Sequence, residues 1–406
     1  METKTNPNIE VADIFSKHKD HLGTLSKEQW KVVQDIINCR TAALGGHTLE
    51  CDNCGHLEHS YNSCRNRHCP KCQFSAKTKW LEDRKKELLP VSYFHLVFTL
   101  PAELNNIILQ NKRICYNILF KAASETLKEV ALNPKNLGAQ IGFFMVLHTW
   151  GQNLMDHPHV HTVAPAGGIS PDGSSWIDCK KEFFLPVKIL SIVFRGKYLN
   201  YLEKAYKRGE LEFHGRIEKL ENEKEFKKVL INSANRPWVV YAKKPFAGPE
   251  QVLDYLGNYT HRIAISNHRL IKIEDDKVHF YYRDYADDNK TKIMTLNVVE
   301  FMRRFLLHVL PAKFMKIRHY GLLGSKYKKE KIEVCRKLIG KRPCNPVTSE
   351  QPSYDRIAED EITVNKRESA EELMKRLFDV DIYQCKKCKK GRMNIVGEIK
   401  AFNSSG

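Results

Sequence analysis

The chain has 406 residues, and its 66 lysines and arginines against 48 aspartates and glutamates give a formal net charge of +18. A hydrophobic fraction of 42% excludes a wholly disordered chain, and the length suffices for roughly two to four domains with buried cores. No apolar run approaches the roughly 18 residues of a membrane-spanning helix, and the first residues lack the apolar core of a secretion signal. The positive charge favours a polyanionic partner, and nucleic acid is the first candidate. The chain is expected in the cytoplasm, where 12 cysteines indicate metal ligands rather than disulfides.

Apolar spacing and the positions of prolines predict helices and strands in alternation along the chain. Helices are expected within the first forty residues and at 77–89, 101–130, 183–230, 249–259 and from Ser369 onward. Strands are expected at 93–100, 143–150, 157–163, 238–242, 262–266, 270–273 and 278–282. Because strands dominate the middle of the chain and helices are inserted between them, we predict an α+β fold.

Composition divides the chain into three expected domains. Residues 1–90 are predicted to be a helical and cysteine-rich domain, residues 91–310 a strand-rich domain, and residues 311–406 a basic, mostly helical region. Between 311 and 342 there are eleven lysines and arginines against two glutamates, which favours contact with phosphates, although a solvated helix face is the alternative. The candidate DNA contacts are Arg65, Arg67, Lys71, Arg262, Arg318, Lys326, Lys328 and Lys329.

Two CxxC pairs, Cys51-x2-Cys54 and Cys69-x2-Cys72, are separated by fourteen residues. Each pair presents two sulfurs on a tight turn, and four thiolates complete the tetrahedral shell of a structural zinc ion. We therefore predict one Zn²⁺ site from Cys51, Cys54, Cys69 and Cys72. Cys64 and His68, inside the intervening loop, are alternatives for one ligand or members of a second site.

A third pair, Cys385-x2-Cys388, lies near the C-terminus and resembles half of a zinc knuckle. The sequence does not identify the other half. Cys335 and Cys344 are candidates, but a lone CxxC is a weak signal. Zinc binding by Cys385 and Cys388 therefore stays open at this point.

The segment His157-Pro-His-Val-His161 lies on a predicted strand. Residues two apart in a strand point to the same face, so His159 and His161 can hold one divalent cation. A single histidine in a sheet usually only packs, but two at this spacing favour metal. Gln152 is the preferred third ligand and His157 the alternative. Two imidazoles leave positions open on the ion, which suits binding of a phosphate oxygen.

Tyr255 and Tyr259 lie four residues apart on a predicted short helix and therefore share a face. Tyrosines at this spacing usually pack against a core. Here the helix contains Gly257 and is followed by the polar pair at 261–262 instead of an apolar stripe, which favours a chemical role. A phenol with a pKa of about 10 is a weak nucleophile, so it requires a nearby cation and a polarised phosphorus to react.

Taken together and in this order, the motifs resemble the HUH-type two-tyrosine rolling-circle transposases of bacterial insertion sequences, the insertion sequence ninety-one group. The segments that carry the resemblance are 63–72, 93–101, 147–154, 157–161, 255–266 and 317–323. A His-x-His motif alone discriminates poorly, but the ordered set is highly specific.

The resemblance implies that residues 1–90 form a zinc-binding domain and that residues 91–310 form an HUH endonuclease core, an antiparallel sheet flanked by helices. His159 and His161 are then expected on a central strand that binds Mg²⁺ or Mn²⁺. It also implies that Tyr255 and Tyr259 attack scissile phosphates of single-stranded DNA, leaving a 5′-phosphotyrosine link and a free 3′ hydroxyl. The expected partners are single-stranded DNA, the terminal hairpins of the mobile element and target DNA. The expected setting is the bacterial cytoplasm, at the nucleoid.

Three other functions compete with a transposase. A plasmid replication initiator or conjugative relaxase shares the chemistry, a zinc-dependent DNA-binding regulator lacks catalysis, and a metallohydrolase uses water in place of tyrosine. The zinc segment and residues 317–323 favour the transposase.

Overall fold

The computed structural model describes residues 9–72, 80–81, 84, 86–180, 183–246, 257, 263–284, 287–340 and 381–402. In chain order the helices are α1 (Val11–His18), α2 (Lys27–Ile37), α4 (Asn105–Gln110), α5 (Lys112–Leu132), α6 (Val187–Lys207), α7 (Glu223–Ala234), α9 (Val298–Leu307) and α10 (Lys328–Gly340). The strands are β1 (Gly46–Cys51), β2 (Leu57–Tyr61), β3 (Tyr93–Thr99), β4 (Gly142–Trp150), β5 (Asp156–Pro165), β6 (Gly167–Ile169), β7 (Trp176–Asp178), β8 (Val240–Phe246), β9 (Leu270–Glu274), β10 (Lys277–Asp284), β11 (Lys290–Asn297), β12 (Ile317–Gly321) and β13 (Met393–Ile399). Short 3₁₀ segments are η1 (Lys19–His21), η2 (Ala42–Leu44), η3 (Ala102–Leu104), η4 (Gly215–Glu221), η5 (Asn267–Arg269) and η6 (Ser325–Tyr327).

These elements fall into two units. The larger unit consists of residues 1–37 and 65–342, and the smaller unit consists of residues 38–64 and 343–406. The predicted boundaries after residues 90 and 310 do not coincide with this division. The reason is strand pairing over long sequence distances: β12 joins the sheet of β4, and β13 joins β1.

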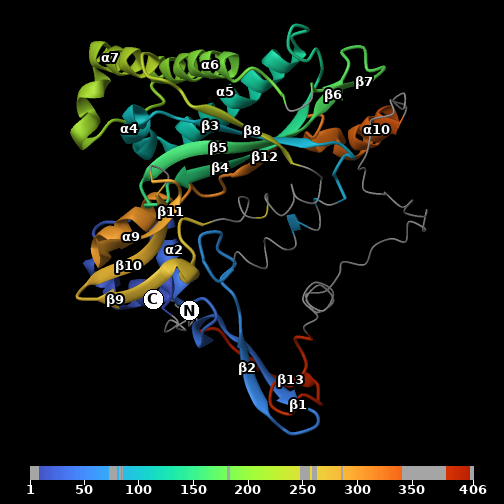
Figure 1. Cartoon of the computed structure of the whole chain (residues 1–406). Helices are drawn as coiled ribbons and strands as arrows, with labels where there is room; N and C mark the ends of the chain where they lie inside the picture. The colour runs from blue at the N-terminus through green and yellow to red at the C-terminus, as the bar shows by residue number, and fades with distance from the viewer. Residues whose placement is uncertain are drawn as a thin grey trace. The chain divides into compact units, whose positions relative to one another are not determined.

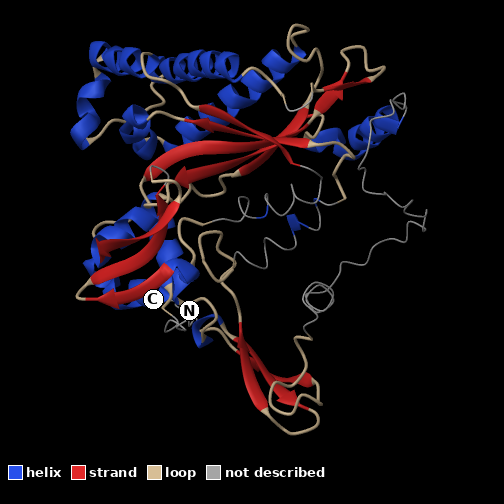
Figure 2. Cartoon of the chain, viewed as in Figure 1, coloured by secondary structure: helices blue, strands red, loops and turns tan. Residues whose placement is uncertain are grey.

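The larger unit contains an antiparallel sheet of five strands in the order β12-β4-β5-β3-β8. Helices α4, α5, α6 and α7 cover one face of this sheet (Figures 1 and 2). The predicted α+β class, with an antiparallel sheet flanked by helices, is therefore confirmed. Within the part of the chain that the structure describes, no helix combines the length and the apolar character needed to cross a lipid bilayer.

The central strands are apolar along almost their whole length because both faces of the sheet are covered. Alternate side chains such as Leu96, Phe98 and Val160 face the helices and belong to the main core. The side chains between them point the other way, where Phe144 and Val163 belong to a second, smaller cluster. Alternation thus places the histidines of β4 and β5 on the face that is opposite to α5 and α6.

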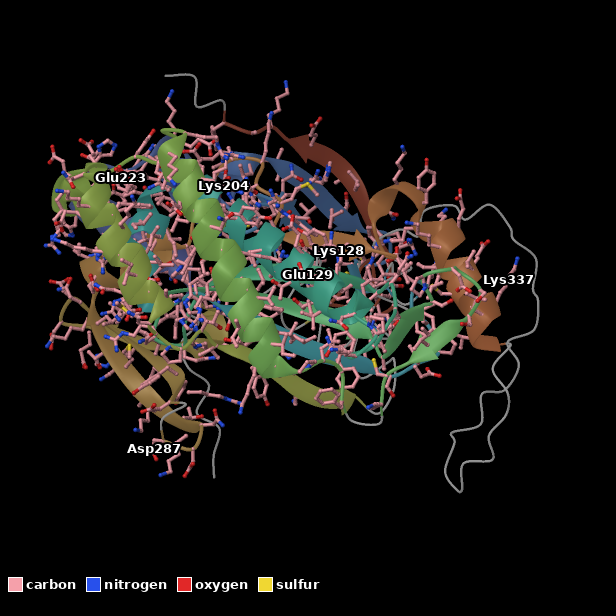
Figure 3. All side chains as sticks on the ribbon, turned by 90° about the horizontal axis from the view of Figure 1, so that it is seen from above. Lys128, Glu129, Lys204, Glu223, Asp287 and Lys337 are labelled. Atoms are coloured by element: carbon pink, nitrogen blue, oxygen red, sulfur yellow. The ribbon has the colours of Figure 1, made fainter. Side chains whose placement is uncertain are left out.

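Helices α5 and α6 lie side by side on the sheet. An ion pair of 2.8 Å between Lys197 on α6 and Glu129 on α5 links them, and Figure 3 labels Glu129 on α5 and Lys204 on α6. The single helix predicted over 101–130 is divided at Asn111, whose backbone is not helical. The Asn111 side chain donates hydrogen bonds to the carbonyls of Ile107 and Glu212, which stabilises the break.

A second sheet in the larger unit has the order β11-β10-β9. Phe280 of β10 packs edge-on against Phe301 of α9, and Phe15 of α1 packs in the same way against Phe305. The predicted strands at 270–273 and 278–282 correspond to β9 and β10. The prediction of a strand at 262–266 differs from the structure, in which residues 263–266 form none.

The smaller unit contains a three-stranded antiparallel sheet in the order β13-β1-β2. The central strand β1 pairs with β2 after a short turn and with β13 from the other end of the sequence. Among the described residues of this unit, one apolar cluster consists of the buried residues Cys51, Cys385 and Met393, with Leu49 and Cys388 packed against them. Such a small apolar core points to a need for additional stabilisation.

Candidate metal centres

Three histidines of the larger unit meet on two neighbouring strands. His159 and His161 lie on β5 with their side chains on the same face, and His148 lies on β4 directly opposite His159 in the strand register. All three side chains are buried, and their candidate ligand nitrogens lie within 4.8 Å of one another. The predicted pair is thereby extended to a group of three imidazoles.

The two β5 imidazoles converge through their Nε2 atoms, which are 3.0 Å apart. Nδ1 of His159 donates a hydrogen bond of 2.6 Å to the carbonyl of His157. In a neutral ring with its proton on Nδ1, the lone pair that can bind a metal ion is on Nε2. Nitrogens that are each about 2.1 Å from a shared octahedral ion lie about 3.0 Å apart when they are adjacent. The observed spacing therefore fits a metal centre.

His95 of β3 supports the group from behind. Its Nε2 lies 2.8 Å from Nδ1 of His161, and the two rings are stacked. Burial, and then the charge of Lys243, lowers the pKa of His95 to about 4, so this ring is neutral at physiological pH. A His161 ring that donates from Nδ1 to His95 has its lone pair on Nε2, the atom that faces His159 and would bind a cation.

The predicted third ligands are Gln152 and His157. Gln152 lies beyond the end of β4, where its main-chain carbonyl accepts a hydrogen bond from Arg269, and its role as a ligand stays a prediction. His157 contributes its carbonyl to His159 rather than its ring to the group. His148 was overlooked because its position depends on how the β4–β5 hairpin is aligned, which its own flanking sequence does not reveal.

The two predicted nucleophiles, Tyr255 and Tyr259, and the predicted DNA contact Arg262 lie outside the described residues. Their roles therefore stay predictions from the sequence.

The cysteines group differently from the prediction. Cys51 and Cys54 lie with Cys385 and Cys388, and the four sulfurs are within 4.8 Å of one another. Cys69 and Cys72 belong to the larger unit, where Cys69 is buried and the Cys72 N–H donates to the Cys69 carbonyl over 3.2 Å. The prediction of one site from Cys51, Cys54, Cys69 and Cys72 is therefore wrong in its grouping, because spacing along the chain does not decide which two turns meet.

Cys388 lies in an environment that favours its thiolate. The N–H groups of Gly391 and Lys390, followed by the amide of Asn53, lower the pKa of the Cys388 thiol to about 5. A thiolate at neutral pH is the form that binds a metal ion.

The predicted DNA contacts divide into engaged and exposed side chains. Arg67 donates to the carbonyls of Phe314 and Pro311, and Lys71 forms an ion pair with Glu10. Both side chains are therefore engaged in contacts within the larger unit.

Of the remaining basic residues, Arg318 lies over the ring of Phe120 and donates to Asn117, while Lys328 pairs with Glu87. In contrast, Arg65, Lys326 and Lys329 are exposed.

Two family models match the chain. Residues 142–331 match a family described as a putative transposase, and residues 10–100 match one described as a transposase zinc-binding domain. The first matched range contains the three clustered histidines. The second contains Cys51 and Cys54, whereas Cys385 and Cys388 lie outside both ranges.

Similar proteins carry related descriptions. A putative transposase, y4qJ of Sinorhizobium fredii, is 51% identical over 358 residues, which cover 87% of this chain and 90% of that protein. The transposase for insertion sequence element IS801 of Pseudomonas savastanoi pv. phaseolicola is 26% identical over 328 residues, covering 79% of this chain and 76% of that protein. The solved structure of the conjugative relaxase TrwC in complex with oriT DNA matches 41% of this chain and 71% of that one, at 14% identity and a TM-score of 0.23, too low to support an argument.

Proposed function

The chain belongs to the insertion-sequence transposases of the IS91 type, and from this premise we propose that it nicks and rejoins single-stranded DNA through a covalent tyrosine–phosphate intermediate. The observation that carries the proposal is the convergence of His148, His159 and His161 on two paired strands, with ring nitrogens within 4.8 Å of one another. Three imidazoles so arranged bind a cation and still leave positions for substrate oxygens.

His148 replaces Gln152 in this proposal as the third ligand of the catalytic cation. When bound, the ion supplies Lewis-acid polarisation of a phosphate oxygen. Of the two cations expected from the sequence, Mn²⁺ suits a set of nitrogen ligands better than Mg²⁺, which prefers oxygen. The protein's own contribution is to hold the ring orientations, through the His157 carbonyl for His159 and through His95 for His161.

The proposed nucleophiles are Tyr255 and Tyr259, as the family resemblance implies. In each cleavage a phenolic oxygen forms a bond to the scissile phosphorus, and the bond from that phosphorus to the 3′ oxygen breaks. The phenol gives up its proton to water, and the departing 3′ oxygen takes one up, which leaves a 5′-phosphotyrosine and a 3′ hydroxyl. The reverse attack by a 3′ hydroxyl rejoins the strand without external energy, since one phosphodiester replaces another.

The proposed substrate is single-stranded DNA at the element ends, including terminal hairpins. The net charge of +18 favours binding to phosphates. Arg65, Lys326 and Lys329 are the preferred phosphate contacts because they are exposed, whereas the other described candidates form hydrogen bonds or ion pairs with protein groups.

The deciding experiment incubates the full chain with Mn²⁺ and a labelled single-stranded oligonucleotide from an element end. We expect a covalent adduct that survives denaturing electrophoresis. The double substitution Tyr255→Phe, Tyr259→Phe should reduce the adduct at least a hundredfold, because no phenol remains to attack. Tyr281→Phe is the matched control, since Tyr281 is an exposed residue of β10, and its adduct yield should equal that of the parent.

Other results of this assay would indicate a different mechanism or function. An adduct that persists in the double variant contradicts the tyrosine assignment. Cleavage without any adduct indicates a hydrolase that uses water, and binding without cleavage indicates a regulator. If the adduct forms on a plasmid transfer or replication origin but not on an element end, the protein acts as a relaxase or a replication initiator.

A further inference from the structure

We propose that Cys51, Cys54, Cys385 and Cys388 bind one zinc ion, so that a segment near the C-terminus completes a zinc module begun near the N-terminus. The matched zinc-binding family ends at residue 100, so it does not assign a role to Cys385 and Cys388. The proposal is independent of the tyrosine chemistry above.

The sulfur positions fit a tetrahedral site. Sγ of Cys51 lies 3.6 Å from Sγ of Cys388, and Sγ of Cys54 lies 3.8 Å from Sγ of Cys385. Four sulfurs that are each about 2.3 Å from one zinc ion lie about 3.8 Å from one another. Sulfurs joined in a disulfide would lie only about 2.05 Å apart, so the geometry favours metal over oxidation.

The two CxxC turns have the same backbone conformation. In the first, Gly55 has a positive φ of 66° and its N–H donates to the Cys51 carbonyl over 3.0 Å. In the second, Lys389 has a positive φ of 56° and its N–H donates to the Cys385 carbonyl over 2.8 Å. Each turn therefore presents its two sulfurs in the same way, as the paired knuckles of one zinc site require.

The two turns are also fastened to each other directly. Asp52 donates its N–H to the carbonyl of Arg392, and the Arg392 N–H donates to the Asp52 carboxylate over 2.8 Å. A side chain at Gly391 would clash, because its Cβ would lie 2.4 Å from Sγ of Cys51 and 2.6 Å from Cβ of Asn53. Glycine at 391 therefore allows the close approach that brings the four sulfurs together.

The pairing of β1 with β13 also brings the two cysteine turns together. Residues 46–51 of β1 pair with residues 393–399 of β13, and the pairing ends at Cys51, where the metal site begins. In the part of this unit that the structure describes, the apolar cluster around the four cysteines contains only three buried residues, two of them cysteines of the group. A module of this size generally requires a disulfide or a metal to stay folded, so zinc binding supplies free energy of folding.

The test counts zinc in full-length variants by elemental mass spectrometry. Two double variants are compared with the parent, one with Cys51→Ser and Cys54→Ser and the other with Cys385→Ser and Cys388→Ser. We expect each double variant to lose about one zinc ion per chain. The quadruple variant should lose no more than either pair, because all four thiols share one ion. Cys179→Ser is the control for removal of a partly buried thiol outside the group, and it should keep its zinc.

Two results would overturn the proposal. One is unchanged zinc content in the Cys385→Ser, Cys388→Ser variant. The other is a quadruple variant that loses two zinc ions, which would show two separate sites.

Hydrogen exchange separates loss of the metal from general misfolding. In the Cys385→Ser, Cys388→Ser variant, amide protection should fall in β1 while β4 and β5 keep theirs, because they belong to the other unit. Equal loss in β4 and β5 would indicate a globally unfolded variant. In that case a milder substitution, Gly391→Ala, decides the question.

Gly391→Ala keeps all four thiols and disturbs only their approach. We expect it to weaken zinc retention against a chelator at least tenfold. The matched control is Gly397→Ala in β13, where the nearest atom to the added Cβ would be 3.8 Å away. Equal retention in the two alanine variants would contradict the role of the close approach.

Discussion

His95 lies outside the group of three imidazoles, yet its contact decides which nitrogen of His161 is available to that group. Its Nε2 atom is 2.8 Å from Nδ1 of His161, and its side chain is buried in the sheet. A ligand that is held in one tautomer by a second residue loses less freedom when it binds a cation. His95 is therefore a positioning residue, and its effect should be on metal affinity before it is on chemistry.

Replacement of His95 tests this role. His95→Leu should weaken Mn²⁺ binding about 10-fold to 100-fold in a calorimetric titration, because His161 loses the partner that fixes its tautomer. His95→Gln places an amide near the same position and should restore most of the affinity. At saturating Mn²⁺ the adduct yield of both variants should approach that of the parent. Unchanged Mn²⁺ affinity in His95→Leu would contradict the positioning role.

The limits of prediction from sequence are clearest at single residues. His159 and His161 could be paired from the sequence because strand alternation is a local property. His148 could not, because it meets them only through the register of the β4–β5 hairpin. In the same way the CxxC spacing identifies each cysteine turn, but Cys51 and Cys385 meet through folding over hundreds of residues.

At the scale of elements, the sheet of the larger unit depends on an edge strand, β12, that comes from the basic C-terminal region. Gly321 ends β12 opposite Gly142 of β4, with a positive φ of 59°. A Cβ at Gly321 would lie 2.0 Å from the carbonyl oxygen of Ile141. The end of this strand therefore requires glycine both for its backbone conformation and for its close contact.

A pair of alanine substitutions tests this requirement. Gly321→Ala should lower the free energy of unfolding by more than about 2 kcal/mol, because it combines left-handed strain with a backbone clash. Gly196→Ala in α6 has no atom within 4 Å of the added Cβ, and it should raise the free energy of unfolding by about 0.5–1 kcal/mol. Urea unfolding of both variants measures the difference, and a Gly321→Ala variant as stable as the parent would refute the argument.

The elements that were predicted well are those whose pattern is set by their own burial. β3, β4 and β5 are apolar and buried on both faces, and the expected ranges 93–100, 143–150 and 157–163 correspond to them. β11 was not predicted, because its residues are mostly exposed and its structure comes from pairing with β10. β1, β2 and β13 depend likewise on strand partners, and two of these three are far apart in the sequence.

At the scale of the whole molecule, the response to acid depends on buried histidines that carry no charge in the folded protein at pH 7. His308 is buried, and its Nε2 donates to the carbonyl of Leu154 over 3.0 Å. Burial lowers its pKa to about 4, and burial has the same effect on His319. Both histidines are neutral in the folded protein at pH 7 but take up protons near pH 6.5 once unfolded.

This difference predicts sensitivity to acid. Because the unfolded state binds more protons than the folded state between about pH 6.5 and pH 4, stability is present above this range and is lost as the pH falls through it. His308 alone should contribute about 3 kcal/mol of that loss by pH 4. In urea unfolding at pH 7 and pH 5.5, His308→Leu should show a smaller drop than the parent, by about 1 kcal/mol.

The control for this prediction is an exposed histidine. His268→Gln should show the same drop between the two pH values as the parent, since this side chain meets solvent before and after unfolding. A His308→Leu variant whose stability falls as steeply as that of the parent would show that other groups govern the acid response.

Because β1 pairs with β13, the small sheet can form completely only after the ribosome has synthesised the C-terminal part of the chain. Cys51 and Cys388 are 337 positions apart, and at about 5–20 residues per second their synthesis is separated by about 20–70 s. During that interval β1 and β2 form a lone hairpin, which is at best marginally stable in water. A translation product that stops early therefore contains the β1–β2 hairpin without the strand β13, and Cys51 and Cys54 without Cys385 and Cys388. Only a chain translated through β13 can complete the three-stranded sheet.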